Sequence, residues 1–302
     1  MRALLGVPAP AKLNWFLHVL GRRDAGLHEL QTVFQFIDWC DEIDFELRED
    51  GEVSRDGADG LGDDDLCVRA ARALQRHTGC GLGVHMRLRK HIPMQAGLGG
   101  GSSDAASVLL ALNRLWGLGL RRGELQALGE GLGADVPVFV FGRGAFAEGS
   151  GTRLRALELP CWQALVAWPG AGLSTAQVFA SESLTRNTPA RTMEGFCEHL
   201  KRVLGEKPGS CCGRDGMAGM AEALGFGAND LQGVATGLLP RLRELGRWLE
   251  HRCGAPARMS GSGSAMFAPW PADAVLGEVP GSWSVRVCRA LSRHPLLDWV
   301  AD

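Results

Sequence analysis

A glycine-rich stretch that leads directly into an apolar helix pattern constrains this chain more than any other feature. Residues 93–112 read PMQAGLGGGSSDAASVLLAL. A helix begins with unpaired backbone N–H groups and the positive end of its macrodipole, and glycines let phosphate oxygens approach those donors without meeting a Cβ atom. The stretch therefore predicts a phosphate-binding loop. Because the chain holds 42 glycines in 302 residues, an ordinary loop is the alternative on local pattern alone.

Composition and charge exclude several classes of protein. The formal net charge is −2, with acidic and basic residues interspersed, so no basic stripe indicates nucleic acid or an anionic membrane as a partner. Nine cysteines without a CxxC pair favour neither a disulfide framework nor a zinc site. Pro8 and Pro10 interrupt the first residues too early for a secretory signal. We expect a cytoplasmic protein with a small-molecule partner, as a monomer or weak homodimer.

Hydrophobic periodicity places the glycine-rich stretch among strands and helices. Residues 13–19 alternate as a strand does, and this pattern puts Lys12 and Asn14 on its more polar face. The uncharged segment 159–181 contains two prolines, so we predict a buried strand and a loop there rather than a membrane span. Further strands are expected at 31–38, 41–47 and 84–93, helices at 63–77, 105–116, 123–132 and 238–252, and a loop at 205–219.

The common phosphate-binding motifs do not fit this chain. The pattern GxxxxGK[ST] is missing, and Ser102 stands where the last glycine of GxGxxG would be. Protein-kinase signatures such as HRD and DFG are missing too. What the sequence does contain is four blocks in a fixed order: PAPAKLN at 8–14, PMQAGLGGGSSDAA at 93–106, GADVPVFVFG at 133–142 and SGSGSAMFA at 260–268.

These blocks resemble the GHMP kinases, the family of galactokinase, homoserine kinase, mevalonate kinase and phosphomevalonate kinase. The resemblance spans residues 8 to about 268 and includes AFAEG at 145–149 and RNTP at 186–189. Within the family it is closest to kinases of a cytidine diphosphate methylerythritol. It implies phosphorylation of a hydroxyl on the methylerythritol moiety, with ATP and Mg²⁺, in isoprenoid precursor biosynthesis.

The resemblance also implies a two-domain α+β fold. Residues 1–156 would form an ATP-binding domain of ribosomal-protein-S5-domain-2-like type, with residues 284–302 returning to it. Residues 157–283 would form a ferredoxin-like substrate-binding domain, and the active site would lie in the cleft between the two.

Two residues are the candidates for catalysis. Asp135 would be the base that accepts the proton of the attacking hydroxyl, although an Asp before Val-Pro is by itself equally a helix N-cap. Lys12 would by itself be a solvated surface lysine. The resemblance places it beside the catalytic Asp, where a cation would keep the carboxylate ionised and oriented.

The glycine-rich stretch supplies the expected ATP site. Its residues are Pro93, Met94, Gln95, Ala96, Gly97, Leu98, Gly99, Gly100, Gly101, Ser102 and Ser103. Ser102 is a candidate neighbour of Mg²⁺, while no metal site made by the protein alone is expected. Asp104 needs no role beyond a favourable interaction with the helix dipole. The glycine–serine turn at 260–264 is expected to back the phosphate region, with a plain tight turn as the alternative.

Five residues are expected at the substrate: Asn14, Leu27, His28, Thr175 and Phe179. The resemblance implies that cytosine stacks between the turn before His28 and Phe179. Leu27 stands where Tyr is expected and Asp65 where Asn is expected, which affects cytosine stacking and adenine recognition respectively. Two other functions stay open, another small-molecule kinase of the family and a catalytically silent nucleotide-binding module. His28 and Phe179 argue against the first, and Lys12 and Asp135 against the second.

Overall fold

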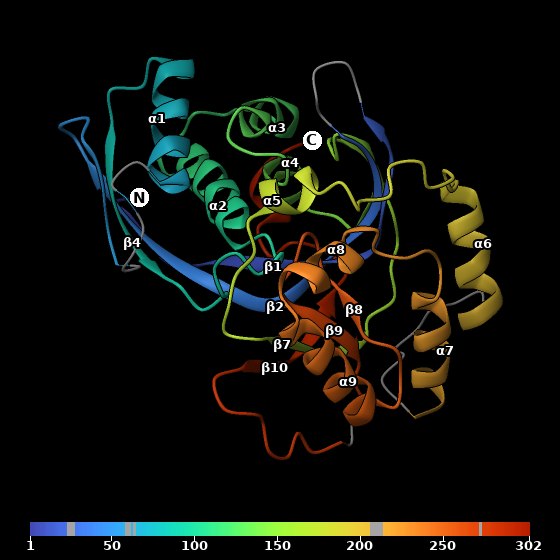
Figure 1. Ribbon diagram of the computed structural model, residues 1–302. Coiled ribbons are helices and arrows are strands. Elements are labelled where there is room, and N and C mark those ends of the chain that lie inside the picture. Colours follow the sequence, from blue (N-terminus) through green and yellow to red (C-terminus); the bar gives the residue numbers. More distant parts are fainter. Residues whose placement is uncertain (23–27, 58–61, 63–64, 206–213, 272–273) are drawn as a thin grey trace.

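The computed structural model describes residues 1–22, 28–57, 62, 65–205, 214–271 and 274–302 (Figure 1). One mixed sheet runs through the described part in the order β3-β4-β2-β10-β7-β9-β8, with β1 and β5 also paired to β2 and β6 paired to β5. The strands are β1 Ala3–Arg22, β2 His28–Arg48, β3 Val53–Asp56, β4 Gly83–Arg89, β5 Ala145–Gly149, β6 Arg153–Ala156, β7 Gln163–Trp168, β8 Arg258–Met259, β9 Met266–Pro269 and β10 Ser284–Leu291.

Helices cover the sheet in two groups. The first group comprises α1 Leu66–Thr78, α2 Gly100–Leu115, α3 Arg122–Glu130 and α4 Val136–Phe141. The second comprises α5 Thr175–Ala180, α6 Met193–Leu204, α7 Arg214–Leu224, α8 Leu231–Leu238 and α9 Arg241–Cys253, and the short helix η1 Leu297–Trp299 follows β10. In Figure 1, α1 to α4 lie over the long β1–β2 pair, and α9 lies beside β7 and β9.

The two long strands carry predicted site residues, among them Lys12 and Asn14. β1 and β2 are antiparallel, with Lys12 opposite Phe36 and Asn14 opposite Phe34. The alternation predicted for 13–19 is confirmed, but both faces of this part of β1 are buried. The first core joins side chains of β2, such as Phe36 and Phe45, to apolar side chains of α1, α2 and α4. This packing fixes the start of α2 relative to β1.

The last strand connects the two groups of elements. β10 pairs with β7 over most of its length and with β2 at Ala290 and Leu291. Beyond it, Leu296 and Val300 are buried in the first core. Residues 284–302 therefore contact both halves of the molecule. We propose the domain limits 1–156 and 157–283, with 284–302 returning, on this arrangement.

Several predicted elements differ from the structure. α2 begins at Gly100 rather than at 105, because tertiary contacts outweigh the poor helix propensity of glycine. Of the loop predicted for 205–219, residues 206–213 lie outside the described residues, and the prediction is wrong from Arg214, where α7 begins. The loop predicted after the strand in 159–181 contains α5. α9 begins at Arg241 because Pro240 occupies its N-cap. Among the described residues, no helix combines the length and apolarity needed to cross a membrane.

Candidate active site

A cavity of about 1010 Å³ brings most of the predicted site residues together. Its walls are formed by β1, the glycine loop, the start of α4, α5 and the turn at 260–264. Of the predicted residues it is lined by Lys12, Asn14, Pro93, Met94, Gln95, Ala96, Gly97, Leu98, Gly99, Gly100, Gly101, Ser102, Asp135, Thr175 and Phe179. Ser103 and His28 do not line it. Leu27 lies outside the described residues.

A second cavity of about 1050 Å³ lies near η1 and contains none of the predicted site residues. Three arginines line it, and each is paired with a carboxylate of residues 298 or 302: Arg122 and Arg143 with Asp302, and Arg293 with Asp298. With Glu158, which also lines this cavity, three acidic side chains face three arginines. The chemistry of the chain is concentrated in the first cavity.

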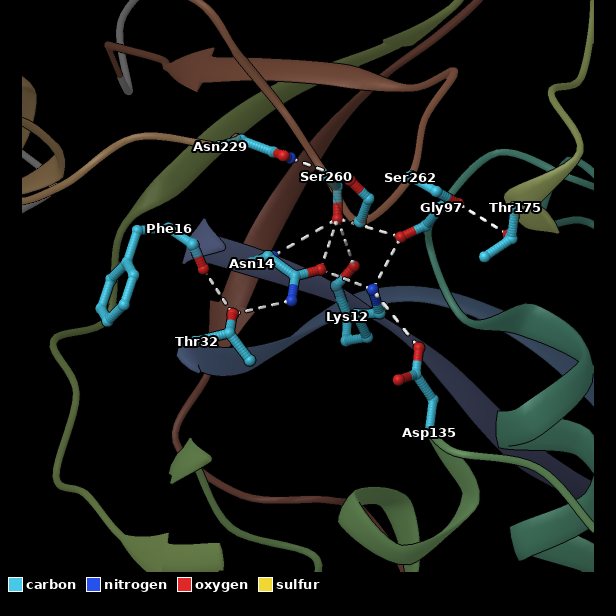
Figure 2. Close-up of polar contacts among 11 residues, drawn as sticks. Lys12, Asn14, Phe16, Thr32, Gly97, Asp135, Thr175, Asn229, Ser260 and Ser262 are labelled. Atoms are coloured by element: carbon cyan, nitrogen blue, oxygen red, sulfur yellow. Dashed lines mark hydrogen bonds and ion pairs between the residues drawn. The ribbon is translucent and has the colours of Figure 1, made fainter. Parts of the chain in front are cut away.

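Lys12 and Asp135 face each other (Figure 2), and both line the first cavity. The Lys12 side chain is 2% exposed, and its Nζ lies 3.5 Å from Oδ2 of Asp135, whose side chain is 36% exposed. Nζ also donates hydrogen bonds to Asn14 Oδ1 at 2.5 Å and to the carbonyl of Gly97 at 2.8 Å. The ammonium is therefore held by three oxygens, one of which belongs to the glycine loop.

Asp135 occupies the N-cap position of α4 but does not act as a cap. Its backbone is αR, with φ −91° and ψ −9°, and its side chain makes no capping hydrogen bond. The carboxylate points to Lys12 instead, as Figure 2 shows. The sequence alone made a helix cap and a catalytic base equally expected for Asp135. The structure shows a carboxylate that lines the cavity without capping α4, and its role as the base stays a prediction.

The burial of Lys12 has an electrostatic consequence. Loss of water around the ammonium lowers the pKa of Lys12 below its ordinary value, and the Asp135 carboxylate opposes this shift. Asp135 thereby favours the charged form of Lys12, and Lys12 supplies a positive charge to the carboxylate. The two side chains form a mutually dependent pair at the wall of the cavity.

Asn14 and Ser260 support this pair from behind. The Asn14 amide accepts from Lys12 at Oδ1 and donates from Nδ2 to Thr32 Oγ1 at 2.9 Å, so both ends of the amide are engaged within the protein. Ser260 Oγ accepts from the Asn14 N–H at 3.3 Å and donates to the Gly97 carbonyl at 3.1 Å. Asn14 accepts a hydrogen bond from Lys12 and also lines the cavity, so its predicted contact with the substrate stays a prediction. Sequence reasoning assigned Ser260 no individual role, and it missed Thr32.

The glycine loop is fixed through four consecutive carbonyls. Those of residues 95–98 accept hydrogen bonds from the N–H groups of Leu173, Ala265 and Lys12 and from the side chains of Lys12 and Ser260. Since these carbonyls face the protein, the first N–H groups of α2, at 100–102, are left without intrahelical acceptors. The loop thus has the backbone polarity expected for an anion site.

Two of the loop glycines are required by packing against the protein itself. A Cβ atom at Gly97 would lie 2.1 Å from the Ser260 carbonyl oxygen, and one at Gly99 would lie 2.9 Å from the Phe139 ring. Both residues also have positive φ, 73° and 76°. At Gly101 the nearest atom would be Leu66 Cδ1 at 3.6 Å, an ordinary contact. The approach of a ligand is therefore easiest at Gly101 and the turn of helix around it.

A buried cluster of charges lies under the start of α2. Lys90 Nζ donates to Asp41 Oδ2 and, at 2.7 Å, to Asp104 Oδ2, and both carboxylates are almost fully buried. Burial raises the pKa of Asp104 to about 7, with Lys90 opposing the shift and Asp41 adding to it. Asp104 was predicted to interact only with the helix dipole. The structure shows that it anchors α2 to Lys90, at the end of β4.

Thr175 and Phe179, which were predicted to contact the substrate, lie on α5 and line the cavity at what we call its substrate end. Thr175 Oγ1 lies 2.7 Å from Ser262 Oγ, a hydroxyl of the turn at 260–264. The Phe179 ring lies against the imidazole of His28, with centroids 4.8 Å apart and planes at 34°. The two rings are in direct contact, so a base would stack on the cavity side of Phe179 rather than between them.

Asp65, the other departure from the family pattern, has a structural role. Its carboxylate caps α1 by accepting from the N–H groups of Cys67 and Val68 at 2.7 and 3.2 Å. It also forms an ion pair with Arg55, at 2.5 Å between Nε and Oδ2, in which both side chains are 7% exposed. Both oxygens of the Asp65 carboxylate thus contact the protein, one the start of α1 and the other Arg55.

Comparison with known proteins identifies the family. The GHMP kinases N terminal domain matches residues 65–143. The 4-diphosphocytidyl-2-C-methyl-D-erythritol kinases of Paracidovorax citrulli and Acidovorax ebreus are 50% and 49% identical to this chain, over 100% and 99% of it and 99% of each relative. The chain belongs to the GHMP kinase family.

Solved structures agree with this assignment. A crystal structure of 4-(cytidine 5′-diphospho)-2C-methyl-D-erythritol kinase matches with a TM-score of 0.70 and 34% identity, over 95% of this chain and 99% of the other. A homoserine kinase from Cytophaga hutchinsonii matches at 0.67 with 14% identity, over 97% and 96% of the two chains, which shows the fold alone. The predicted α+β fold of GHMP kinases is confirmed, and the chain is a small-molecule kinase. The family implies ATP as the phosphate donor.

Proposed function

We propose that this kinase phosphorylates a hydroxyl on the methylerythritol moiety of 4-diphosphocytidyl-2-C-methyl-D-erythritol, in isoprenoid precursor biosynthesis. Full-length relatives about half identical to this chain carry that kinase name. The observation that carries the chemistry is the Lys12–Asp135 pair, which lies in the same cavity as the glycine loop and α5. We expect a cytoplasmic enzyme that acts as a monomer or weak homodimer.

Phosphoryl transfer then proceeds with a simple division of roles. The substrate hydroxyl oxygen forms a bond to the γ-phosphorus of ATP as the bond from that phosphorus to the bridging β–γ oxygen breaks, and ADP leaves. Asp135 accepts the hydroxyl proton. Lys12 keeps the carboxylate oriented, and the α2 N–H groups at 100–102 bind the phosphates. Thr175 and Phe179 contact the cytidylyl part of the substrate.

Mg²⁺ fits this cavity as an ion held mainly by phosphates and water. Among the described residues, no three His, Cys, Asp or Glu side chains are grouped to hold a metal. The Ser102 side chain and the Asp135 carboxylate line the same cavity as the glycine loop, and both offer oxygen ligands. The buried Ser103 hydroxyl, which follows Ser102 in sequence, has no hydrogen-bond partner among the residues that the structure describes. When bound, the ion neutralises charge on the transferring phosphoryl group.

A coupled assay of ADP release tests this function. ATP and Mg²⁺ are supplied with 4-diphosphocytidyl-2-C-methyl-D-erythritol, mevalonate or homoserine in separate reactions. We expect turnover with the cytidine diphosphate substrate only. Turnover with mevalonate or homoserine alone would assign another reaction of the family, and ATP binding without turnover on any of the three would indicate a silent nucleotide-binding module.

A further inference from the structure

Arg186 connects the two aromatic residues at the substrate end. It follows α5 in sequence and lies 158 positions from His28. Its Nη2 donates to the carbonyls of Phe179 and Ser181 at 2.9 and 2.8 Å, and its Nη1 donates to that of Leu184 at 3.1 Å. Its Nε donates to His28 Nε2 at 3.2 Å. One guanidinium thus fixes the end of α5 and the start of β2 together.

The contact with His28 determines where the imidazole carries its proton. An arginine side chain has donors only and stays protonated, so His28 Nε2 must present its lone pair to Arg186. In the neutral ring the proton then resides on Nδ1. A protonated ring would place an N–H group against the guanidinium N–H. Burial, Arg186 and Arg22 all lower the pKa of His28, which agrees with a neutral ring.

The same arginine sets the position of the Phe179 wall. It binds the Phe179 carbonyl, while the Phe179 ring lies 4.8 Å from the imidazole whose tautomer it fixes. Phe179 lines the cavity. The guanidinium therefore binds the backbone of Phe179 and the side chain of His28. Arg186 itself does not line the cavity.

We propose that Arg186 is a positioning residue of the substrate end, which holds His28 as the Nδ1–H tautomer against Phe179. The imidazole does not line the cavity, so Arg186 acts on the substrate through the Phe179 ring. The cavity side of that ring fits the π-face of a cytosine. The inference rests on the proposed function for its substrate, but the contacts of Arg186 are independent of it.

Arg186→Gln tests the proposal, with Arg202→Gln as its matched control. Arg202 also contacts a histidine, with Nη2 3.0 Å from His199 Nδ1, but on the exposed surface of α6. Arg186→Gln should raise KM for the cytidine diphosphate substrate roughly tenfold, while kcat and KM for ATP change less than about twofold. This rise in KM should grow as the pH falls from 7.5 to 5.5. Without Arg186 the pKa of His28 is higher, so more of the imidazole is protonated at the lower pH and its contact with Phe179 changes. Arg202→Gln should leave all of these unchanged.

Histidine ¹⁵N chemical shifts of the ligand-free protein give a second readout that needs no substrate. We expect His28, assigned through a His28→Gln variant, to show a protonated Nδ1 in the native protein and a mixture of tautomers in Arg186→Gln. Arg186→Lys retains one donor for Nε2, so it should restore the tautomer and the flatter pH profile in part. If Arg186→Gln does not fold, Arg186→Lys is the variant used to test the proposal.

The outcomes separate this inference from the proposed function. If the native protein does not turn over the cytidine diphosphate substrate, the proposed function is wrong, and the ¹⁵N shifts still decide the role of Arg186. If the native protein is active and Arg186→Gln keeps its substrate KM, pH profile and tautomer, Arg186 is not a positioning residue. A KM change without any change of pH profile or tautomer would also overturn the proposal.

Discussion

The two ends of the cavity are held by different kinds of contact. One end, here called the catalytic end, contains Lys12, Asp135 and the glycine loop. There, other segments bind the four carbonyls of residues 95–98, and Gly97 and Gly99 pack where no Cβ atom fits. At the substrate end, the side chain of Arg186 contacts Phe179, Ser181, Leu184 and His28 and so connects α5 to the start of β2. Phosphoryl transfer depends on prearranged positions of charge, and backbone contacts fix these most firmly. At the substrate end, by contrast, one side chain makes four of the contacts.

Replacement of Asp135 should have the largest effect of the predicted variants. The effect should fall on kcat and not on ATP affinity. Asp135→Asn keeps the shape of the side chain but cannot accept the hydroxyl proton. We expect kcat to fall by roughly 10²–10⁴, the contribution of a positioned acid–base group, with ATP affinity little changed. Steady-state kinetics and a calorimetric titration with ATP measure the two quantities.

Asp298→Asn is the matched control for this variant. Asp298 is also paired with a basic residue, Arg293, but outside the active-site cavity. It should leave kcat unchanged. If Asp135→Asn retains more than about a tenth of the native kcat, Asp135 is not the base.

The second prediction tests the backbone contacts of the catalytic end. Gly97→Ala places a Cβ atom 2.1 Å from the Ser260 carbonyl oxygen, at a positive φ, so the loop and the turn at 260–264 must separate. We expect a loss of about 1–3 kcal/mol in the free energy of unfolding. ATP affinity should fall with it, since the same carbonyls orient the loop. Denaturant unfolding and ATP titration measure both effects.

Gly101→Ala is the control for Gly97→Ala, because it adds a side chain to the same loop without a clash. Its Cβ atom would meet only Leu66 Cδ1 at 3.6 Å. Because alanine is the better helix former, we expect the free energy of unfolding to stay the same or to rise by up to about 1 kcal/mol. Equal destabilisation by the two variants would mean that the contact with Ser260 does not hold the loop.

Local patterns predicted much of the fold because they report which face of an element is buried. The alternation in residues 13–19 lies within β1, and the apolar spacing in 63–77 and 123–132 corresponds to α1 and α3. The errors fall where tertiary contacts decide. The first turn of α2 contains two glycines and still forms a helix, since the preceding carbonyls at 95–98 are already bound.

The site was predictable only where a motif names its residues. Lys12, Asp135 and the glycine loop came from blocks that resemble a family, and the structure places them in one cavity. Ser260 and Arg186 act on residues 246 and 158 positions away, and no periodicity relates such distant residues. Lys90 shows the same limit, because its two carboxylate partners become neighbours only when β2, β4 and α2 have packed.

The third prediction concerns the aromatic wall of the substrate end. Phe179→Ala removes the π-face that lines the cavity but leaves its carbonyl, and so the Arg186 contact, in place. A base–aromatic stack is worth about 1–3 kcal/mol, so substrate KM should rise by roughly 5- to 150-fold, with kcat and KM for ATP nearly unchanged.

A double variant then shows whether the wall and Arg186 act as one unit. Substitutions of residues in contact often give non-additive effects. The Phe179 carbonyl accepts a hydrogen bond from Arg186, and the Phe179 ring packs on His28. We expect Phe179→Ala combined with Arg186→Gln to raise substrate KM less than the product of the two single effects, since much of what Arg186 orders is already lost. If the two effects multiply, Arg186 orients His28 independently of Phe179. If Phe179→Ala leaves substrate KM unchanged, the base does not stack on this ring, and the contrast between the two ends of the cavity no longer describes how substrate binds.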